Sequence, residues 1–379
     1  MPIRPADTGT DTDTGTGTDT DTDTDTDTDT GTDTGTGTGT DTGTDTDTGT
    51  NMDTGAETVR FRIGADENGL GPRLGPMVVT AVMARVTGDG FSIASRAPKG
   101  ALAQRLGDSK KLVSHGDVAL GEAWTRALVA RGCGREPVGP AVSPDALVHS
   151  VSIDDRQTLR TPCPSHVGPQ CWSESGENLT APDDLVKAVH KDLDKLAAKG
   201  VEIVAVRSVI LCAWRMNEGV NAGKNRFLLD LHAMERLILE LRGMASTDVH
   251  AVCGKVGGFG RYSSAFGPLG GRLHAILEEK RSRSAYHFPG VGEIAFVQDS
   301  DASDLCVAMA SMVGKYVREA LMARVVRFYQ SHDPSLPDAS GYHDPVTNAF
   351  TEATVKLRRK HDVPDTCFER RRMDEVTAR

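Results

Sequence analysis

The sequence of 379 residues lacks the features that mark membrane proteins and secreted proteins. It has no stretch of roughly 18 uninterrupted apolar residues, which is the length that a membrane-spanning helix requires. Its seven cysteines form no CxxC pair and are odd in number, a usage typical of a reducing compartment. It also lacks the basic start and the apolar segment of a secretory signal peptide. These absences predict a soluble, cytoplasmic protein with no membrane partner.

Residues 1–57 contain very few apolar side chains. From Asp7 to Thr54 the chain is almost only Thr, Asp and Gly, so nothing offsets the conformational entropy that ordering would cost. A calcium-binding β-roll needs apolar residues at fixed positions, which this tract lacks. A disordered tail is therefore predicted. Its 14 Asp, one Glu and one Arg give a formal charge of −14 against −10 for the whole chain, so residues 58–379 carry +4, which suits a polyanionic partner.

Residues 58–379 alternate between apolar runs typical of strands and amphipathic runs typical of helices. Strands are expected over 59–65, 77–86, 201–211, 249–253 and 293–298, and helices through Trp124 and Leu128 and over 183–199, 224–242 and 302–330. Strands that alternate with helices after an opening hairpin predict an α/β domain with a mixed sheet. Gly, Pro and Ser interrupt this pattern over 132–182, which predicts an irregular surface insertion.

Two groups of carboxylates stand at the ends of expected strands. Asp66 and Glu67 follow the first strand, and Asp299, Asp301 and Asp304 follow the last. An ionised carboxylate is costly in a core because it loses its hydration, and a bound cation removes that cost. Hard oxygen ligands from separate strand ends favour Mg²⁺ or Mn²⁺, and two such ions assist phosphodiester cleavage. For either group alone, a turn at Asp66 or a helix N-cap at Asp301 is an equally good explanation.

Four motifs resemble, in order and approximate spacing, those of the type 2 ribonucleases H (ribonuclease HII and relatives). IGADENGLGPRLGPMVVTAV, beginning at Ile63, resembles the family's G-I-D-E-A-G-R-G-P-x-x-G-P-V-V, and GDSKKL at 107–112 resembles D-S-K-K-L. DASDLCVAMASMVGKYVREALM, from Asp301, is similar to D-A-x-x-x-x-I-A-A-A-S-I-x-A-K-V-x-R-D-x-x-M. SGYHDPVTNAF, from Ser340, is similar to the segment around K-G-Y-G-T. The resemblance covers most of residues 58–379.

This resemblance implies a ribonuclease H-like domain, with a mixed sheet flanked by helices, that cleaves RNA in an RNA–DNA hybrid or at ribonucleotides embedded in duplex DNA. The products would carry a 3′-hydroxyl and a 5′-phosphate. By family position, Asp66, Glu67 and Asp301 are the catalytic metal ligands, and the segment from about 331 to 379 contacts the substrate. The resemblance also implies substrate contacts by the loop backbone at Gly69 and Gly71 and phosphate binding by Lys110 and Lys111. Tyr342 takes the place of the tyrosine that stacks at the RNA–DNA junction.

The sequence departs from the family in the third carboxylate, in the substrate loop and in a His-Arg pair near the C-terminus, which is replaced by something like FERR over 368–371. The Asp of the family's V-D-G, at the end of the strand before a glycine-rich turn, is replaced by Cys253 or, with the register shifted by one, by Gly254. Neither offers a side-chain oxygen, and Asp304 or Asp299 is a candidate replacement, with a solvated helix-start acid as the alternative. The family's G-R-G loop reads GLG over 69–71, which keeps the backbone but loses the arginine that helps to read the 2′-hydroxyl.

Three functions are therefore open. The chain is an active but divergent type 2 ribonuclease H, or a catalytically weakened relative that binds nucleic acid without cutting it efficiently, or a metal-dependent nuclease of the same fold with another substrate. A monomer is expected. All three require Asp66 and Glu67 to lie near Asp301 in the folded chain.

Overall fold

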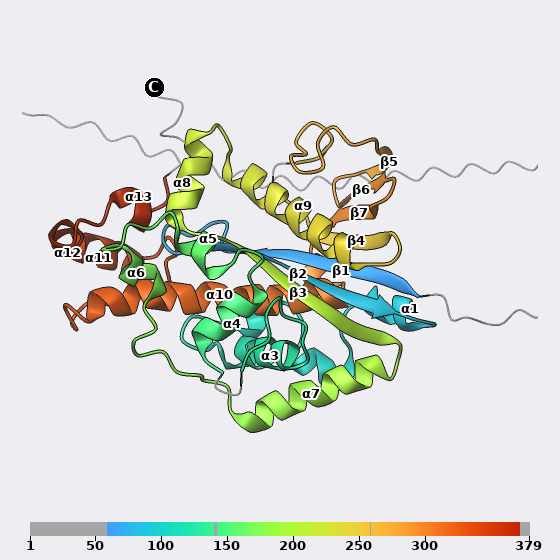
Figure 1. The fold of residues 1–379 in the computed structure, drawn as a ribbon, viewed down its shortest axis with the longest axis horizontal. Helices are drawn as coiled ribbons and strands as arrows, with labels where there is room; N and C mark the ends of the chain where they lie inside the picture. The colour runs from blue at the N-terminus through green and yellow to red at the C-terminus, as the bar shows by residue number, and fades with distance from the viewer. Residues whose placement is uncertain (1–58, 140–141, 258, 372–379) are drawn as a thin grey trace, which may run out of the picture. The chain divides into compact units, whose positions relative to one another are not determined.

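A single seven-stranded sheet organises the part of the chain that the computed structural model describes, residues 59–139, 142–257 and 259–371. The strand order is β3-β2-β1-β4-β7-β6-β5 (Figure 1). Strands β1, β4 and β7 are mutually parallel and the other neighbours pair antiparallel, so the predicted mixed sheet is confirmed. The strands are β1 (Arg60–Asn68), β2 (Met77–Val86), β3 (Val201–Leu211), β4 (Val249–Gly254), β5 (Ala275–Glu279), β6 (Arg283–Phe288) and β7 (Gly292–Val297).

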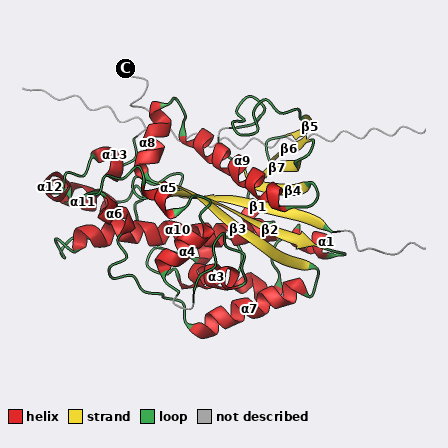
Figure 2. Cartoon of the chain, in the orientation of Figure 1, coloured by secondary structure: helices red, strands yellow, loops and turns green. Residues whose placement is uncertain are grey.

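Helices cover both faces of this sheet (Figure 2). The long helix α10 lies on one face and is backed by α3 and α7, whereas α9 lies on the other face. The α-helices are α1 (Gly90–Ala94), α2 (Ser109–Leu112), α3 (Ala119–Ala130), α4 (Pro144–Val151), α5 (Arg156–Arg160), α6 (Gly168–Trp172), α7 (Asp183–Ala197), α8 (Ala213–Asn221), α9 (Arg226–Met244), α10 (Leu305–Gln330), α11 (Pro345–Ala353), α12 (Val355–Lys360) and α13 (Asp365–Phe368). Two 3₁₀ helices are η1 (Gly100–Gln104) and η2 (Ser300–Ala302). The predicted α/β class is thus confirmed.

The alternation of side chains along β2 explains the two cores. Val78 and Val82 point to the face of α10 and α3, and the intervening Val79 and Ala81 point to the face of α9. A strand that is apolar on both sides belongs inside a covered sheet, and β2 lies between β3 and β1. Helix α10 is buried on nearly its whole circumference because it is sandwiched between the sheet and an outer helical layer.

Residues 132–182 are more regular than the sequence indicates. Helices α4, α5 and α6 lie within this stretch, and Leu147, Val148 and Val151 pack into the core beside α3. The Ser-Pro pair that suggests a loop is in fact a helix start: the Ser143 hydroxyl accepts a hydrogen bond from the Ala146 N–H, and proline occupies the first turn. The expected irregular insertion is therefore a set of short helices that close one side of the core.

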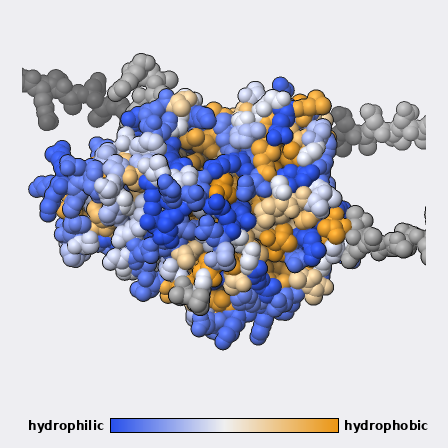
Figure 3. All heavy atoms as spheres, viewed as in Figure 1, coloured by the Kyte–Doolittle hydropathy of each residue, from blue (hydrophilic) through white to orange (hydrophobic). Residues whose placement is uncertain are grey.

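The segment from 331 to 371 folds against the C-terminal half of α10. Phe350 and Phe368 join Leu74 and Tyr329 in a third apolar cluster, which carries α11 to α13. Figure 3 shows a mostly hydrophilic surface over these helices, whereas hydrophobic residues gather on the side of β5.

The predicted tail over 1–57 lies outside the described residues. No helix in the described ranges has the length and apolar character needed to cross a membrane.

Candidate metal and nucleic-acid site

The carboxyl ends of three parallel strands meet at one edge of the sheet. The β1–β4 ladder ends at the pair Ala65–Cys253, so Asp66 and Glu67 stand just beyond it. Strand β4 pairs with β7 as far as Val297, and β7 runs into η2, which carries Asp301. Open α/β sheets bind ligands at this end of their strands. The topology therefore directs both predicted groups of carboxylates to one edge.

Glycine at position 64 lets β1 lie directly against the first turn of α10. A Cβ atom there would stand 2.2 Å from the Val307 backbone nitrogen and 2.3 Å from the Cys306 carbonyl carbon, so no side chain fits. Because side chains alternate along a strand, Asp66 points to the same face as Gly64, toward α10. The close backbone contact thus places the Asp66 carboxylate beside the junction of η2 and α10.

The electrostatics of Asp66 show that other carboxylates are near it. Burial raises the pKa of Asp66 to about 8, the negative charges of Asp301 and Glu67 add to this rise, and the Ser311 hydroxyl opposes it. Burial also raises the pKa of Glu67, against the opposing effect of Lys110. All three acids are half-buried. Asp66, Glu67 and Asp301 therefore share one electrostatic environment.

These acids do not form a closed metal cage as they stand. In the described ranges, no three His, Cys, Asp or Glu side chains are grouped closely enough to hold a metal ion. Carboxylates that repel one another separate unless a cation or a proton lies between them. The donor set itself consists of hard oxygens, which suit Mg²⁺ or Mn²⁺.

Asp304 has a different role from the metal ligand that the sequence suggests. Its Oδ1 accepts hydrogen bonds from the backbone N–H groups of Cys306 and Val307, at 2.9 and 3.0 Å. Its Oδ2 accepts from Arg62, whose Nε lies 3.0 Å away, in an ion pair that is buried on both sides. Both oxygens are thus engaged in capping α10 and in binding Arg62 on β1. This geometry argues against Asp304 as a replacement ligand.

Strand β4 ends without a carboxylate on either face. Cys253 is fully buried and points toward α9, among the apolar residues of that face. Gly254 points the other way, and a Cβ atom there would lie 2.9 Å from Asp66 Oδ1. The position beside Asp66 is therefore Gly254, and the position on the α9 face is Cys253. Neither side chain replaces the oxygen ligand that the resemblance leads one to expect.

Sequence reasoning missed Asp230, a buried acid on α9. Its side chain is almost fully enclosed, at 2% relative exposure, and its Oδ1 has no hydrogen-bond partner among the described residues. Burial raises the pKa of Asp230, and the charges of Glu67 and Asp66 raise it further. A sequence signal existed, because 230 falls four residues before Met234 and seven before Leu237, on the buried stripe of the helix.

The predicted phosphate-binding lysines lie on α2. Lys110 is exposed, and its charge opposes the rise in the pKa of both Glu67 and Asp301, so it stands beside the acids. Lys111 is also exposed, with its Nζ 3.3 Å from a carboxylate oxygen of Asp108. A buried hydrogen bond of 2.8 Å between the hydroxyls of Ser109 and Ser311 ties α2 to α10. Lys110 thus has the better position to meet a phosphate next to the carboxylates.

The loop over 69–76 is held by arginines from elsewhere in the chain. Gly69 has a φ of +96°, which few other residues adopt, and its carbonyl accepts a hydrogen bond from Arg370. Arg370 also donates to the Gly75 carbonyl at 2.9 Å, and Arg226 reaches the Leu70 carbonyl at 3.5 Å. Gly71 itself is exposed, with open space around its Cα. Leu70 replaces the family arginine, but two guanidinium groups still stand next to the loop.

Tyr342 lies over the cations next to this loop. Its ring is 40% exposed, with the guanidinium carbon of Arg318 at 4.7 Å and Lys315 Nζ at 5.5 Å from the ring centroid. Arg318 is fully buried, and its charge opposes the rise in the pKa of Glu67. An exposed aromatic ring that lies over two cations, close to carboxylates, is a surface on which a nucleobase can stack.

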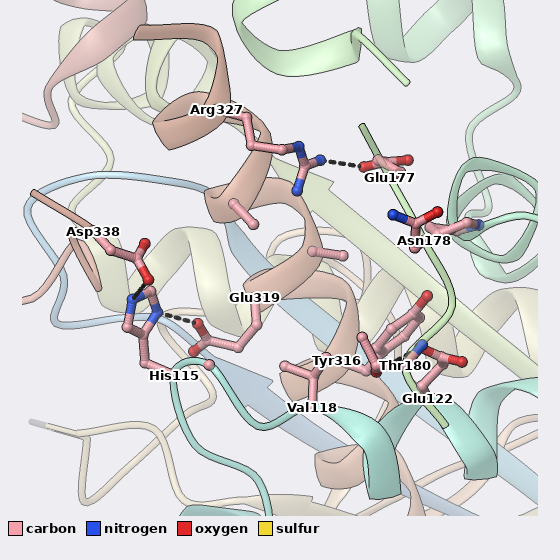
Figure 4. Close-up of a pocket in the computed structure, with 14 residues that line it drawn as sticks. His115, Val118, Glu122, Glu177, Asn178, Thr180, Tyr316, Glu319, Arg327 and Asp338 are labelled. Atoms are coloured by element: carbon pink, nitrogen blue, oxygen red, sulfur yellow. Dashed lines mark hydrogen bonds and ion pairs between the residues drawn. The ribbon is translucent and has the colours of Figure 1, made fainter. Parts of the chain in front are cut away.

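Glu319 on α10 binds both of these cations, because its Oε1 accepts hydrogen bonds from Lys315 at 2.7 Å and from Arg318 at 2.6 Å. Burial alone would raise the pKa of Glu319, but His115, Arg318 and Lys315 outweigh it and lower the pKa to about 2. Figure 4 shows His115 between Glu319 and Asp338, at the rim of a pocket between α10 and the segment that carries Glu177. The network thus holds Arg318 beneath the ring of Tyr342.

No family model and no curated protein matches the sequence. Among solved structures, the chain is similar to a chain of the PCNA:RNase HII complex from Archaeoglobus fulgidus, with 15% identity, a TM-score of 0.38 and coverage of 82% of this chain and 94% of that one. It is also similar to Bst-RNase HIII in complex with Mn²⁺ (12%, 0.38, 84% and 68%) and to the ribonuclease H2 from Pyrococcus horikoshii (12%, 0.31, 81% and 92%). These identities and TM-scores are too low to support an argument about the site. The function of the site is therefore inferred from the chain's own residues.

Proposed function

We propose that this protein is an endonuclease that depends on Mg²⁺ or Mn²⁺ and cleaves RNA in an RNA–DNA hybrid or at ribonucleotides embedded in duplex DNA. The observation that carries the proposal is the shared environment of Asp66, Glu67 and Asp301, from two distant parts of the chain, with Lys110 exposed beside them. Carboxylates that are half-buried and repel one another at the strand ends are unfavourable unless a cation from solution joins them. A basic, aromatic rim next to them suits a polyanion.

The residues divide the work as follows. Asp66, Glu67 and Asp301 would hold the cation, which supplies an activated water and stabilises the leaving oxygen. Lys110 neutralises a phosphate near the acids. The loop backbone at Gly69 and Gly71 approaches the sugar, where a 2′-hydroxyl distinguishes RNA from DNA. A base stacks on the exposed ring that covers Arg318.

A second function follows from the missing carboxylate at the end of β4. A chain with Cys253 and Gly254 there would bind a hybrid through the same basic rim but cut it poorly, because metal ligands set the cation affinity. This alternative keeps every contact to nucleic acid and removes turnover. It is separated from the first function by comparing binding with cleavage in the same samples.

The test uses the full chain and three labelled duplexes: an RNA–DNA hybrid, a DNA duplex with one ribonucleotide and an all-DNA control. We expect cleavage of the first two in Mn²⁺ or Mg²⁺, with a 3′-hydroxyl and a 5′-phosphate, and none after EDTA. Asp66→Asn should lower the rate by about 100-fold or more while leaving the binding anisotropy nearly unchanged. Equal background cleavage by both proteins, with intact binding, would establish the alternative instead.

A further inference from the structure

The environment of Asp230 differs from that of an acid that supports a fold. The side chain is 2% exposed, and its Oδ1 meets no hydrogen-bond donor in the part of the chain that the structure describes. Leaving a buried carboxyl oxygen without a partner is unfavourable, and leaving it ionised is more so. A proton or a cation from outside the polypeptide relieves this cost.

Another buried acid on α9, Glu235, has hydrogen-bond partners and serves as a comparison. Glu235 is equally buried, yet its Oε2 accepts the backbone N–H of Gly267 at 3.0 Å and that of Leu269 at 2.7 Å. These bonds fasten the loop after β4 to the helix. Asp230, five residues earlier, has no equivalent loop to fasten, and so it is not explained as an anchor.

Asp230 faces the acidic strand ends. Because side chains alternate along β1, Glu67 points to the face that α9 covers, and Cys253 at the end of β4 points to that face too. The charged groups that act on Asp230 are Glu67 first and Asp66 second. Burial raises the pKa of the Cys253 thiol, and the negative charge of Asp230 adds to this rise. Asp230 therefore stands where a carboxylate from β4 is missing.

We propose that Asp230 supplies, from helix α9, the carboxylate that strand β4 lacks, and that it completes with Asp66, Glu67 and Asp301 a binding site for Mg²⁺ or Mn²⁺. The inference rests on the proposed function, since both use the same cation. In this chain the fourth oxygen ligand comes from a helix on the opposite face of the sheet from α10. A cation would then be held at the carboxyl end of β1, with ligands from both faces of the sheet.

The direct test measures Mn²⁺ binding by the full chain, without nucleic acid, from the electron paramagnetic resonance signal of the free ion. The variants are Asp230→Asn, which keeps shape and removes charge, and Glu235→Gln, the matched loss of a buried acid on the same helix. Asp230→Asn should weaken Mn²⁺ binding by about 10-fold or more, whereas Glu235→Gln should bind as the wild type does. Thermal unfolding with and without Mn²⁺ supplies the second readout.

A metal ligand and a structural acid differ in that second readout. For Asp230→Asn, the melting temperature without metal should stay equal or rise, because an unpartnered buried acid is removed, and the rise caused by Mn²⁺ should shrink. For Glu235→Gln, the melting temperature without metal should fall and the rise caused by Mn²⁺ should persist. A lower melting temperature of Asp230→Asn without metal, together with normal Mn²⁺ affinity, would overturn the proposal.

A relocated ligand also predicts rescue. In the wild type, Cys253→Asp should give no gain in Mn²⁺ affinity, because it adds a second negative charge next to the Asp230 carboxylate. In Asp230→Asn, the same substitution should restore the affinity. A large gain from Cys253→Asp in the wild type would show an incomplete site and would overturn the proposal. Binding that is lost in Asp66→Asn but kept in Asp230→Asn rejects only this inference. A wild type that binds no Mn²⁺ rejects the cation site and the proposed function together.

Discussion

The two long helices on opposite faces of the sheet each bring a buried aspartate toward β1, and the two aspartates differ in their partners. At the start of α10, Asp304 receives two backbone N–H groups and the guanidinium of Arg62. In α9, the Oδ1 of Asp230 receives nothing from the described residues. The first aspartate carries its compensating charge within the chain. The second depends on a charge from solution, and this difference separates an acid that builds the fold from one that serves a site.

The largest expected effect comes from removing the cation that pairs with Asp304. Arg62→Met keeps much of the side-chain volume but leaves Asp304 buried without its cation, which should lower the free energy of unfolding by about 3–5 kcal/mol. Urea denaturation followed by circular dichroism measures this. A loss below about 1 kcal/mol would mean that the helix N–H groups alone suffice for Asp304, and the contrast with Asp230 would lose its basis.

Moving α10 away from β1 tests whether the acids depend on close packing. Gly64→Ala forces a methyl group against the backbone of Val307, so we expect a loss of about 1–3 kcal/mol and weaker Mn²⁺ binding, because Asp66 and Asp301 move apart. Gly243→Ala, at a helical position with open space, is the control and should stabilise the protein by about 0.5–1 kcal/mol. Unchanged Mn²⁺ affinity in Gly64→Ala would show that the backbone contact does not set the spacing of the acids.

The smallest expected effect concerns the ionised carboxylate of Glu319, a second compensated acid. Its hydrogen bond raises the pKa of His115, so the imidazolium stabilises the fold below its unfolded pKa of about 6.5, and this contribution is lost as the pH rises through the raised value. Glu319 stays ionised throughout, since its pKa is about 2. His115→Gln should therefore destabilise the protein by at most about 1 kcal/mol at about pH 5.5 and have no effect at about pH 9. Melting temperatures across this range give the profile, and a constant difference between the proteins would contradict it.

The central sheet could be predicted because its strands are long and apolar on both sides. Met77–Val86 and Val201–Leu211 have the bounds that the sequence indicates, and α9 and α10 differ from theirs by a few residues. Strands β5 and β6 were not predicted: β5 exposes Ile276 and Leu277, so its pattern lacks the regular burial that marks a strand. Short helices in 132–182 were missed because a Ser-Pro helix start looks like a loop.

The candidate site was predictable only where its chemistry lies in consecutive residues. Asp66 with Glu67 and the DASD stretch from Asp301 stand at strand ends that periodicity can locate. Asp230 and Arg370 meet the same edge only through tertiary packing, across more than 160 and 300 residues of chain. An acid within the apolar stripe of α9 was the available signal for the first. Arg370 gave none, since nothing in a local pattern shows which carbonyl a distant guanidinium will bind.

The hydrogen bonds from Arg370 to the Gly69 and Gly75 carbonyls have a consequence for biosynthesis. The loop next to Glu67 leaves the ribosome before strand β2 and every later element, and the Arg370 that fixes it follows helix α13. Until the residues around position 370 have emerged, the nascent polypeptide has these acids but lacks the arginine that fixes the loop over 69–76. A chain that is cut short before that point is thus expected to lack both hydrogen bonds that fix the Gly69 and Gly75 carbonyls.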